Sequence, residues 1–134
     1  DVYDVYLKAL ALNQFKKRPL FKPLFEVFKR AKGQLHTQIL KEVQPKLFET
    51  PEEKKLYSHL LQVRSDLKGL SVAKEYLKAF ELLATFQPLL SQLFEKVKIL
   101  TDDEDLRINR LALLSQIQKL FNSLLDFSVI NIES

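Results

Sequence analysis

One stretch, residues 101–126 (TDDEDLRINRLALLSQIQKLFNSLLD), constrains the fold more than any other because it has the pattern of a single long helix. Thr101 and Glu104 have the spacing of a capping box, and the acids from Asp102 to Asp105 occupy the first turn, where the helix dipole favours negative charge. One broad apolar arc runs along this helix, and an arc of that width contacts several neighbouring helices. The arc consists of Leu106, Leu111, Leu113, Leu114, Ile117, Leu120, Phe121, Leu124 and Leu125.

Arg110 projects from the middle of this apolar arc. A guanidinium group in that position is costly unless a carboxylate or backbone carbonyl groups receive it. The residue is either a buried structural arginine that pairs with an acid of a neighbouring helix, or an arginine that reaches out to a ligand. We favour the structural interpretation, which predicts that removing Arg110 destabilises the domain.

The sequence offers little material for a β-sheet. Only Gly33 and Gly69 are glycines among 134 residues, and no stretch alternates polar and apolar side chains for long. We therefore predict an all-α fold, in which residues 1–134 form a single bundle of about five to six helices. Cysteine is absent, so no disulfide can staple the bundle, and this composition favours a reducing, cytoplasmic location.

Prolines, glycines and capping residues divide the rest of the chain. The predicted helices are residues 2–17, 20–32, 51–68, 71–86 and 88–97, and residues 34–49 are predicted to hold a short helix followed by a loop. Thr50, Pro51 and Glu53 mark one start most specifically, as a capping threonine, a first-position proline and the glutamate of a capping box. Gly69 is predicted to end the helix that follows.

The two ends of the chain carry further expectations. In the first helix the buried face is predicted to hold Val2, Tyr6, Ala9 and Leu10, with Tyr3 beside them. The chain opens without methionine and is helix-like almost at once, which suggests a piece cut from a longer protein. At the other end, the apolar residues after 126 are expected to fold back on the core. They are Phe127, Val129 and Ile130.

The inventory of reactive residues argues against catalysis. His36 and His59 are the only histidines, and neither has a partner at metal-ligand spacing, so no metal site is expected. No glycine-rich loop could cradle a phosphate, and no serine occupies a nucleophile elbow. The acids from Asp102 to Asp105 are better explained by helix capping than by a cation site. No apolar run reaches the length of a membrane span and no signal peptide is visible, so we expect a soluble domain without a membrane partner.

Basic residues concentrate in the first part of the chain. Residues 1–48 contain ten Lys or Arg and four acids, a net charge of +6, whereas residues 49–134 contain eleven and thirteen, a net charge of −2. Residues 15–32 contain only one acid, Glu26. They combine cations that can neutralise phosphates with aromatic rings that could stack on unpaired bases. The cations of this basic stretch are Lys16, Lys17, Arg18, Lys22, Lys29, Arg30 and Lys32, and its aromatic residues are Phe15, Phe21, Phe25 and Phe28. We expect the phenylalanines to be buried, because they follow the helical period, and the cations to bind a polyanion.

From residue 93 onward the chain resembles the C-terminal end of the bacterial glycyl-tRNA synthetase β subunit. Residues 93–97, LFEKV, stand at the family's Phe-Phe-Asp-x-Val segment, residues 106–114, LRINRLALL, match Leu-Arg-x-Asn-Arg-Leu-Ala-Leu-Leu, and residues 126–128, DFS, match the closing Asp-Phe-Ser. Residues 104–107, EDLR, are similar to the Asp-Ala-Leu-Arg signature of the related anticodon-binding domain of arginyl-tRNA synthetase.

Shorter similarities to the same family occur earlier in the chain. Residues 28–31, FKRA, resemble part of a Lys-Arg-Val-Ala-Asn segment, with Gly33 in place of the asparagine, and residues 47–49 and 56–57 resemble its Leu-Phe-Glu and Leu-Tyr pair. The resemblance implies a DALR-type helical bundle that recognises the anticodon of glycine tRNA. Glycine anticodons share two cytosines, which such a domain would read in a splayed loop.

The resemblance also implies what the domain lacks. The family's catalytic site lies on a separate α subunit, so this chain should hold no catalytic residue and no cofactor, while the parent enzyme joins glycine to its tRNA with ATP and magnesium. The implied partners are glycine tRNA and the α subunit, with no DNA and no membrane. The expected RNA contacts are Lys16, Lys17, Arg18, Lys22, Lys29, Arg30 and Lys32, with Arg107 and Asn109 as weaker candidates that helix packing could also explain.

Two alternatives remain open at this point. One is a helical protein-interaction module, for instance the surface by which a β subunit meets its partner, with an incidental basic face. The other is the anticodon domain of arginyl-tRNA synthetase, which fits the Asn109-Arg110 pair less well.

Overall fold

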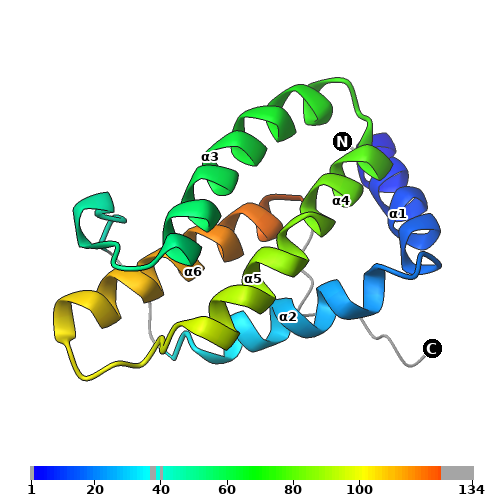
Figure 1. The fold of residues 1–134 in the computed structure, drawn as a ribbon. Coiled ribbons are helices and arrows are strands. Elements are labelled where there is room, and N and C mark those ends of the chain that lie inside the picture. The colour runs from blue at the N-terminus through cyan, green and yellow to red at the C-terminus, as the bar shows by residue number, and fades with distance from the viewer. Residues whose placement is uncertain (1, 37–38, 40, 125–134) are drawn as a thin grey trace.

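A computed structural model of the chain describes residues 2–36, 39 and 41–124. Helices and turns account for the regular structure of these residues, with no strand among them, which confirms the all-α prediction (Figure 1). The elements in order are α1 (Val2–Lys16), α2 (Phe21–Gly33), the 3-10 helix η1 (Pro45–Leu47), α3 (Pro51–Val72), α4 (Tyr76–Ala84), α5 (Phe86–Lys96) and α6 (Glu104–Leu124). None of the described helices is long and apolar enough to cross a membrane.

Helices α4 and α5 form the centre of the bundle. Only Thr85 separates them, and its hydroxyl donates a hydrogen bond to the Leu82 carbonyl oxygen at 2.5 Å, so the two helices follow each other as one slightly broken rod (Figure 1). Helix α3 packs along both members of this rod. Helix α1 packs on α4, and α2 packs on α5 and α6. The predicted boundary at residues 86–88 therefore falls slightly late.

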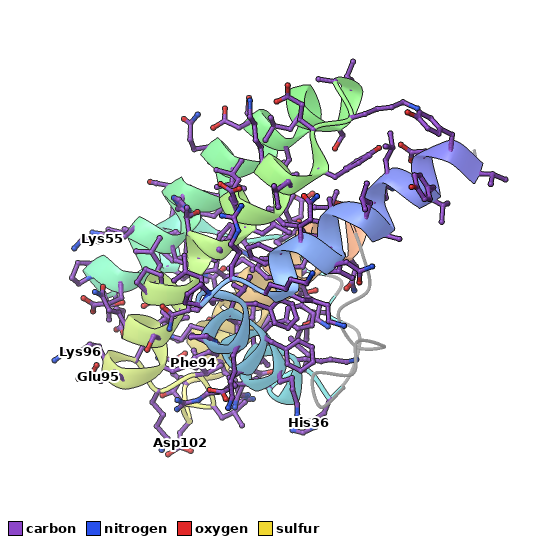
Figure 2. All side chains as sticks on the ribbon, turned by 90° about the vertical axis from the view of Figure 1, so that its right-hand side faces the viewer. His36, Lys55, Phe94, Glu95, Lys96 and Asp102 are labelled. Atoms are coloured by element: carbon purple, nitrogen blue, oxygen red, sulfur yellow. The ribbon has the colours of Figure 1, made fainter. Side chains whose placement is uncertain are left out.

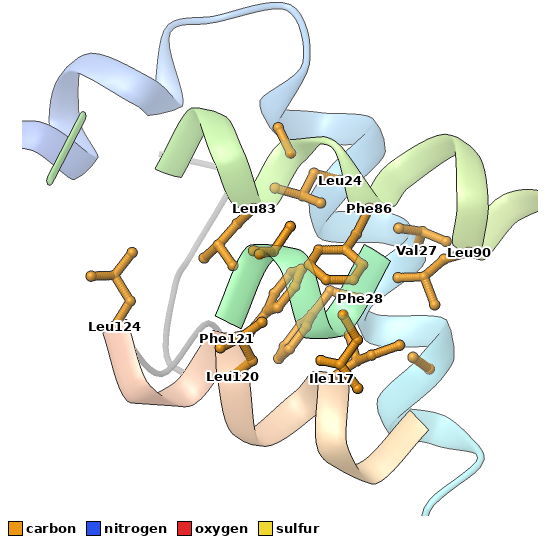
Figure 3. Close-up of a cluster of buried hydrophobic side chains, with 14 of the residues drawn as sticks. Leu24, Val27, Phe28, Leu83, Phe86, Leu90, Ile117, Leu120, Phe121 and Leu124 are labelled. Carbon is orange, nitrogen blue, oxygen red and sulfur yellow. The ribbon is translucent and has the colours of Figure 1, made fainter. Parts of the chain in front are cut away.

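Three aromatic rings from three different helices meet in the core. Phe28 of α2 and Phe121 of α6 are stacked with ring centroids 5.2 Å apart, and Phe86 of α5 lies 5.6 Å from Phe121. Leucine side chains such as Leu83 and Leu90 surround these rings (Figure 3). The predicted apolar arc of the last helix is largely confirmed, since Leu113, Ile117 and Phe121 are almost completely buried. The same holds for Leu114, Leu120 and Leu124, whereas Leu106 and Leu111 are partly exposed.

Other predicted helix boundaries also need correction, and α4 begins at Tyr76, not at residue 71. The capping box predicted at Thr101 is wrong, because α6 begins at Glu104 and Asp103 caps it by accepting a hydrogen bond from the Leu106 N–H at 3.2 Å. Gly69 does not end α3, which continues to Val72.

The true end of α3 is a turn at Lys74, which adopts a φ of 57°. There the Glu75 N–H donates to the Leu70 carbonyl oxygen and the Lys74 N–H donates to that of Ser71. This is the Schellman arrangement, which usually has glycine at the left-handed position. A lysine at that position gave no sequence signal for a helix end.

The predicted buried face of α1 is also wrong. Val2, Tyr3 and Tyr6 are 88, 61 and 60% exposed, and Leu10 is 44% exposed. The helix instead packs through Phe15, which stacks on Phe80 of α4 with ring centroids 5.7 Å apart. Because helix α1 is apolar on both sides, the periodicity of its sequence could not distinguish the two, and the predicted side is the one that faces solvent. We call this solvent-facing side the outer face of α1. It consists of Val2, Tyr3, Val5, Tyr6 and Leu10.

A polar contact ties the first turn of α1 to α4. The Tyr76 hydroxyl donates a hydrogen bond to the Asp4 carboxylate. This bond raises the pKa of Tyr76 to about 12. The same bond lowers the pKa of Asp4, with help from Lys8 and Lys74 and against a smaller opposing effect of burial.

These pKa shifts make the α1–α4 contact sensitive to pH. The contribution of Tyr76 is fully present below pH 10.0, the pKa of an unperturbed tyrosine, and is lost as pH rises to about 12. The contribution of Asp4 is present above pH 3.8 and is lost as pH falls through its lowered pKa. We expect the difference in melting temperature between the parent chain and a Tyr76→Phe variant to shrink between pH 10 and about 12. A difference that stays constant across that range would contradict the assignment.

Candidate nucleic-acid interface

Helix α2 has one buried side and one basic side. Phe21, Leu24, Phe25, Val27, Phe28 and Ala31 form the buried side. Lys22 and Lys29 lie seven residues apart, so they share the exposed side about 10 Å from each other along the helix axis. Arg30 is exposed beside Lys29, and Glu26 is the single acid on the helix. The packing of α2 on α5 and α6 thus fixes the direction in which its cations point.

The turn from α1 to α2 carries three more cations. Lys16 is partly exposed, and Lys17 and Arg18 are exposed. Arg18 lies 3.6 Å from Glu81 of α4, and both side chains are about half exposed, so this pair contributes little stability. Within the described residues, no carboxylate lies within ion-pair distance of Lys17, Lys22 or Lys32. We call the exposed cations Lys17, Lys22, Lys29, Arg30 and Lys32 the basic face.

The four phenylalanines interleaved with these cations belong to the core. Phe15, Phe21, Phe25 and Phe28 are at most 5% exposed, which confirms the prediction that they are buried. Their rings contact other core rings, as when Phe15 meets Phe21 edge to face at 5.8 Å. None of the four can therefore stack on an RNA base.

One aromatic residue from outside the basic stretch lies beside the basic face. The guanidinium carbon of Arg30 lies 4.6 Å from the centroid of the Phe94 ring, which is partly exposed at the end of α5. Figure 2 shows Phe94 where α5 meets α2, at the same end of the bundle as Lys96 and His36. Two of the segments with family resemblance, residues 28–31 and 93–97, meet at this contact. No local signal in the sequence could have paired them.

The two weaker RNA candidates both have partners within the protein. Asn109 is 3% exposed, its side-chain oxygen accepts a hydrogen bond from the Gln44 N–H at 2.7 Å, and its side-chain nitrogen donates to the Gln44 carbonyl oxygen at 3.0 Å. Arg107 Nη1 donates to the carbonyl oxygen of Thr101 at 3.0 Å. These contacts favour structural roles: Asn109 fixes the loop before η1 onto α6, and Arg107 supports the start of α6.

Arg110 has the ion pair that the structural interpretation predicts. Its guanidinium is 6% exposed, and Nη2 lies 3.3 Å from Glu53 Oε1, which is fully buried, and 3.2 Å from Glu49 Oε1. Nη1 donates to the Lys98 carbonyl oxygen at 2.8 Å. Arg110 Nε and Glu53 Oε2 are buried without a hydrogen-bond partner among the described residues. Arg110 therefore joins the start of α3, the α5–α6 connection and α6.

Glu53 has a second role that the sequence did reveal. Its Oε1 accepts a hydrogen bond from the Thr50 N–H at 3.3 Å, and its own N–H donates to Thr50 Oγ1 at 3.2 Å. The predicted capping box at the start of α3 is thus confirmed. The box holds the carboxylate that receives Arg110, so helix capping and the buried ion pair depend on the same side chain.

Nothing in the described part of the chain resembles a metal centre, since no group of three His, Asp or Glu side chains is placed to hold an ion. His59 Nε2 lies 2.6 Å from the Thr85 hydroxyl, and burial lowers the pKa of its imidazole. Its ring also packs edge-on against Phe86 at 4.8 Å. These contacts account for His59 as part of the helix packing.

An all-α bundle that shows a basic helix side to solvent is typical of nucleic-acid-binding domains. The sequence matches the DALR anticodon binding domain over residues 24–133, and the chain belongs to this family. The match begins within α2 and includes the whole of α3 to α6. The sequence resemblance is thereby confirmed.

Curated relatives carry the name glycine–tRNA ligase beta subunit. The protein from Syntrophomonas wolfei is 34% identical over 130 residues, which is 97% of this chain and 19% of the relative. The protein from Geotalea daltonii is 38% identical over 127 residues, 95% of this chain and 18% of the relative. The protein from Syntrophus aciditrophicus is 35% identical over 134 residues, 100% of this chain and 19% of the relative. The chain thus spans about a fifth of the length of these relatives.

Proposed function

We propose that this chain binds the anticodon loop of glycine tRNA through the basic face, as the anticodon-binding part of a glycyl-tRNA synthetase β subunit. The observation that carries this proposal is a DALR-family bundle whose basic face has a single acid, Glu26, among its cations. Relatives named glycine–tRNA ligase beta subunit supply the identity of the tRNA.

The chemistry of the basic face suits a folded RNA loop. Lysine and arginine side chains neutralise phosphates and release the counterions condensed on the RNA. Phosphate contacts position the loop, whereas base contacts must discriminate among sequences. In an anticodon loop the bases can be splayed away from one another, so their edges and faces become available to a protein surface.

The catalytic work of such an enzyme would lie outside this domain. A parent synthetase would use ATP and magnesium to attach glycine, with an α subunit as its partner, in the cytoplasm where tRNA is charged. The domain would contribute affinity and selection of the correct tRNA. It would contribute no reacting group, in line with the lack of recognisable catalytic or metal-binding motifs in the sequence.

Binding to RNA at two salt concentrations tests the proposal. We expect the chain to bind a glycine tRNA transcript with a slope of log affinity against log salt near −4, as about five phosphate contacts give. Replacing the anticodon cytosines should weaken binding beyond the shared salt effect. Lys22→Ala should reduce the steepness of the salt slope by about 1, whereas Lys68→Ala, an exposed lysine of α3, is the matched control and should leave it unchanged. Equal binding to both transcripts would contradict anticodon recognition.

One observation favours a second function, contact with another protein surface. The outer face of α1 exposes five large apolar side chains, and Val5 among them is 65% exposed. Contiguous apolar surface of this kind is typical of interaction sites. A contact made by this face would depend little on salt, in contrast to RNA binding by the basic face, so the same titration separates the two functions.

A further inference from the structure

The contact between Arg30 and Phe94 differs from every other cation contact on the basic face. Lys17, Lys22 and Lys32 show no aromatic partner within the described residues, and Lys29 reaches Phe25, whose ring is buried. Arg30 alone among these cations combines an exposed guanidinium with a partly exposed ring beneath it. Helices α2 and α5 pack directly on each other, so the core fixes the backbone on both sides of the contact.

A guanidinium group held over a ring has one flat side covered and one flat side open. The guanidinium carbon of Arg30 lies 4.6 Å from the Phe94 ring centroid and Arg30 is exposed, so a guanidinium stacked parallel on this ring would keep its other flat side free for a base. Arginine planes stack on aromatic rings and also on nucleic-acid bases, whereas a lysine ammonium has no plane. An arginine that is already oriented loses less freedom on binding, so its stacking energy is better retained.

We propose that Arg30, supported by Phe94, is the platform on which one unpaired base of the bound RNA stacks. This inference rests on the proposed function and adds to it the place where a base, as opposed to a phosphate, is held. The four phenylalanines near the cations are buried and cannot serve. Tyr3 and Tyr6 are exposed, but they lie among the apolar side chains of the outer face of α1. Lys29, adjacent to Arg30, is placed to hold a neighbouring phosphate.

An abasic substitution separates base stacking from phosphate binding because it removes a base and keeps its phosphate. The probes are the anticodon stem-loop of glycine tRNA and three versions of it, each with one anticodon nucleotide replaced by an abasic residue. We expect the parent chain to bind one of the abasic loops about 5-fold to 150-fold more weakly than the intact loop, the usual range for losing one stacked base.

Arg30→Lys is the decisive variant because it keeps the charge and removes the plane. In this variant the ratio of intact to abasic affinity should fall close to 1, while the salt slope stays at the parent value. Phe94→Leu, which keeps an apolar side chain but removes the ring, should lower the ratio part of the way. Lys68→Arg is the matched control: it adds a plane on α3, outside the basic face, so the ratio should remain that of the parent. Unchanged thermal melting of each variant confirms that the fold is intact.

Several results would overturn the platform. They are a parent chain that binds all four loops equally, an Arg30→Lys variant that keeps the parent's ratio, or a Phe94→Leu variant that leaves the ratio untouched. For either variant result, salt-dependent binding to the intact loop with a preference for the anticodon cytosines would leave the proposed function standing, whereas a parent chain that binds all four loops equally would also contradict anticodon recognition. A parent chain that binds none of the loops would reject both the platform and the proposed function.

Discussion

An Arg110→Ala variant is expected to be about 3–5 kcal/mol less stable than the parent chain. The reason is the partner that it leaves behind: the Glu53 side chain is fully buried, and without Arg110 its negative charge has no cation within reach among the described residues. The Lys98 carbonyl oxygen loses its donor as well. For 134 residues, a loss of that size lowers the melting temperature by roughly 10–18 °C.

Arg107→Ala is the matched control for this experiment. Arg107 lies three residues earlier on α6, is partly exposed, and donates to backbone carbonyl groups at the surface. Its removal should cost about 1 kcal/mol, the usual net value of a hydrogen bond that water can replace. Equal melting temperatures for the Arg110→Ala variant and the parent chain would show that the ion pair is not structural.

A double replacement tests whether the cost comes from the orphaned charge. Glu53→Gln keeps an oxygen that can accept from the Thr50 N–H, so it preserves part of the capping box while removing the charge. Combined with Arg110→Met, it should be more stable than the sum of the two single losses predicts, by about 1–3 kcal/mol. Strict additivity would mean that Arg110 acts through Lys98 or Glu49 instead.

A Phe121→Ala variant is expected to lose about 3–5 kcal/mol of stability through a different mechanism. Phe121 is 0% exposed and touches the rings of Phe28 and Phe86, so its removal empties the point where α2, α5 and α6 meet. Rigid helices on three sides cannot collapse fully into the space, and a cavity remains.

Denaturant unfolding measures this loss directly. Leu100→Ala is a suitable control, since Leu100 is 46% exposed and its truncation should cost no more than about 0.5 kcal/mol. Phe121→Leu should lie between the two, because it keeps much of the volume. A Phe121→Ala variant as stable as the Leu100→Ala variant would mean that the three helices do not depend on this ring.

Elements whose residues have a single structural use could be predicted from the sequence. The threonine, proline and glutamate at residues 50–53 begin a helix almost regardless of context, and α3 begins there. The apolar arc of α6 was recognisable because the opposite side of the helix is polar, as exposed Lys119 and Asn122 show. Arg110 could be interpreted because a charge on an apolar arc has few alternatives to an internal partner.

The wrong predictions share a physical cause: in each case the local sequence pattern is compatible with two structures of similar energy. Helix α1 is apolar on both sides, and its packing partners, Phe80 of α4 and Phe21 of α2, decide that Phe15 is buried and Tyr6 is not. Thr101 and Asp103 are both good capping residues, and the path of the preceding loop selects Asp103. The left-handed turn at Lys74 forms without a glycine, so no residue type in the sequence indicated that the helix ends there.

For the candidate site, the sequence located the cations but not their surroundings. The basic stretch was visible as a scarcity of acids, whereas the ring under Arg30 comes from Phe94, which is 64 residues away (94 − 30). The partner of Asn109 is a backbone group of Gln44, and backbone groups leave no signature in side-chain patterns. The predictions for Leu125, Phe127, Val129 and Ile130 and the closing DFS motif fall outside the described residues.

Helix α2 carries most of the basic face and part of the core, so RNA binding at this face, as proposed, would place most of the conformational cost on the RNA. Phe28 and its neighbours hold the helix in place before any RNA arrives, so the protein surface has little conformational entropy left to lose. The rearrangement needed for binding would then fall on the nucleic acid, whose loop must unstack to meet a rigid surface. Loops that open easily would be favoured by their own flexibility, in addition to the contacts that they make.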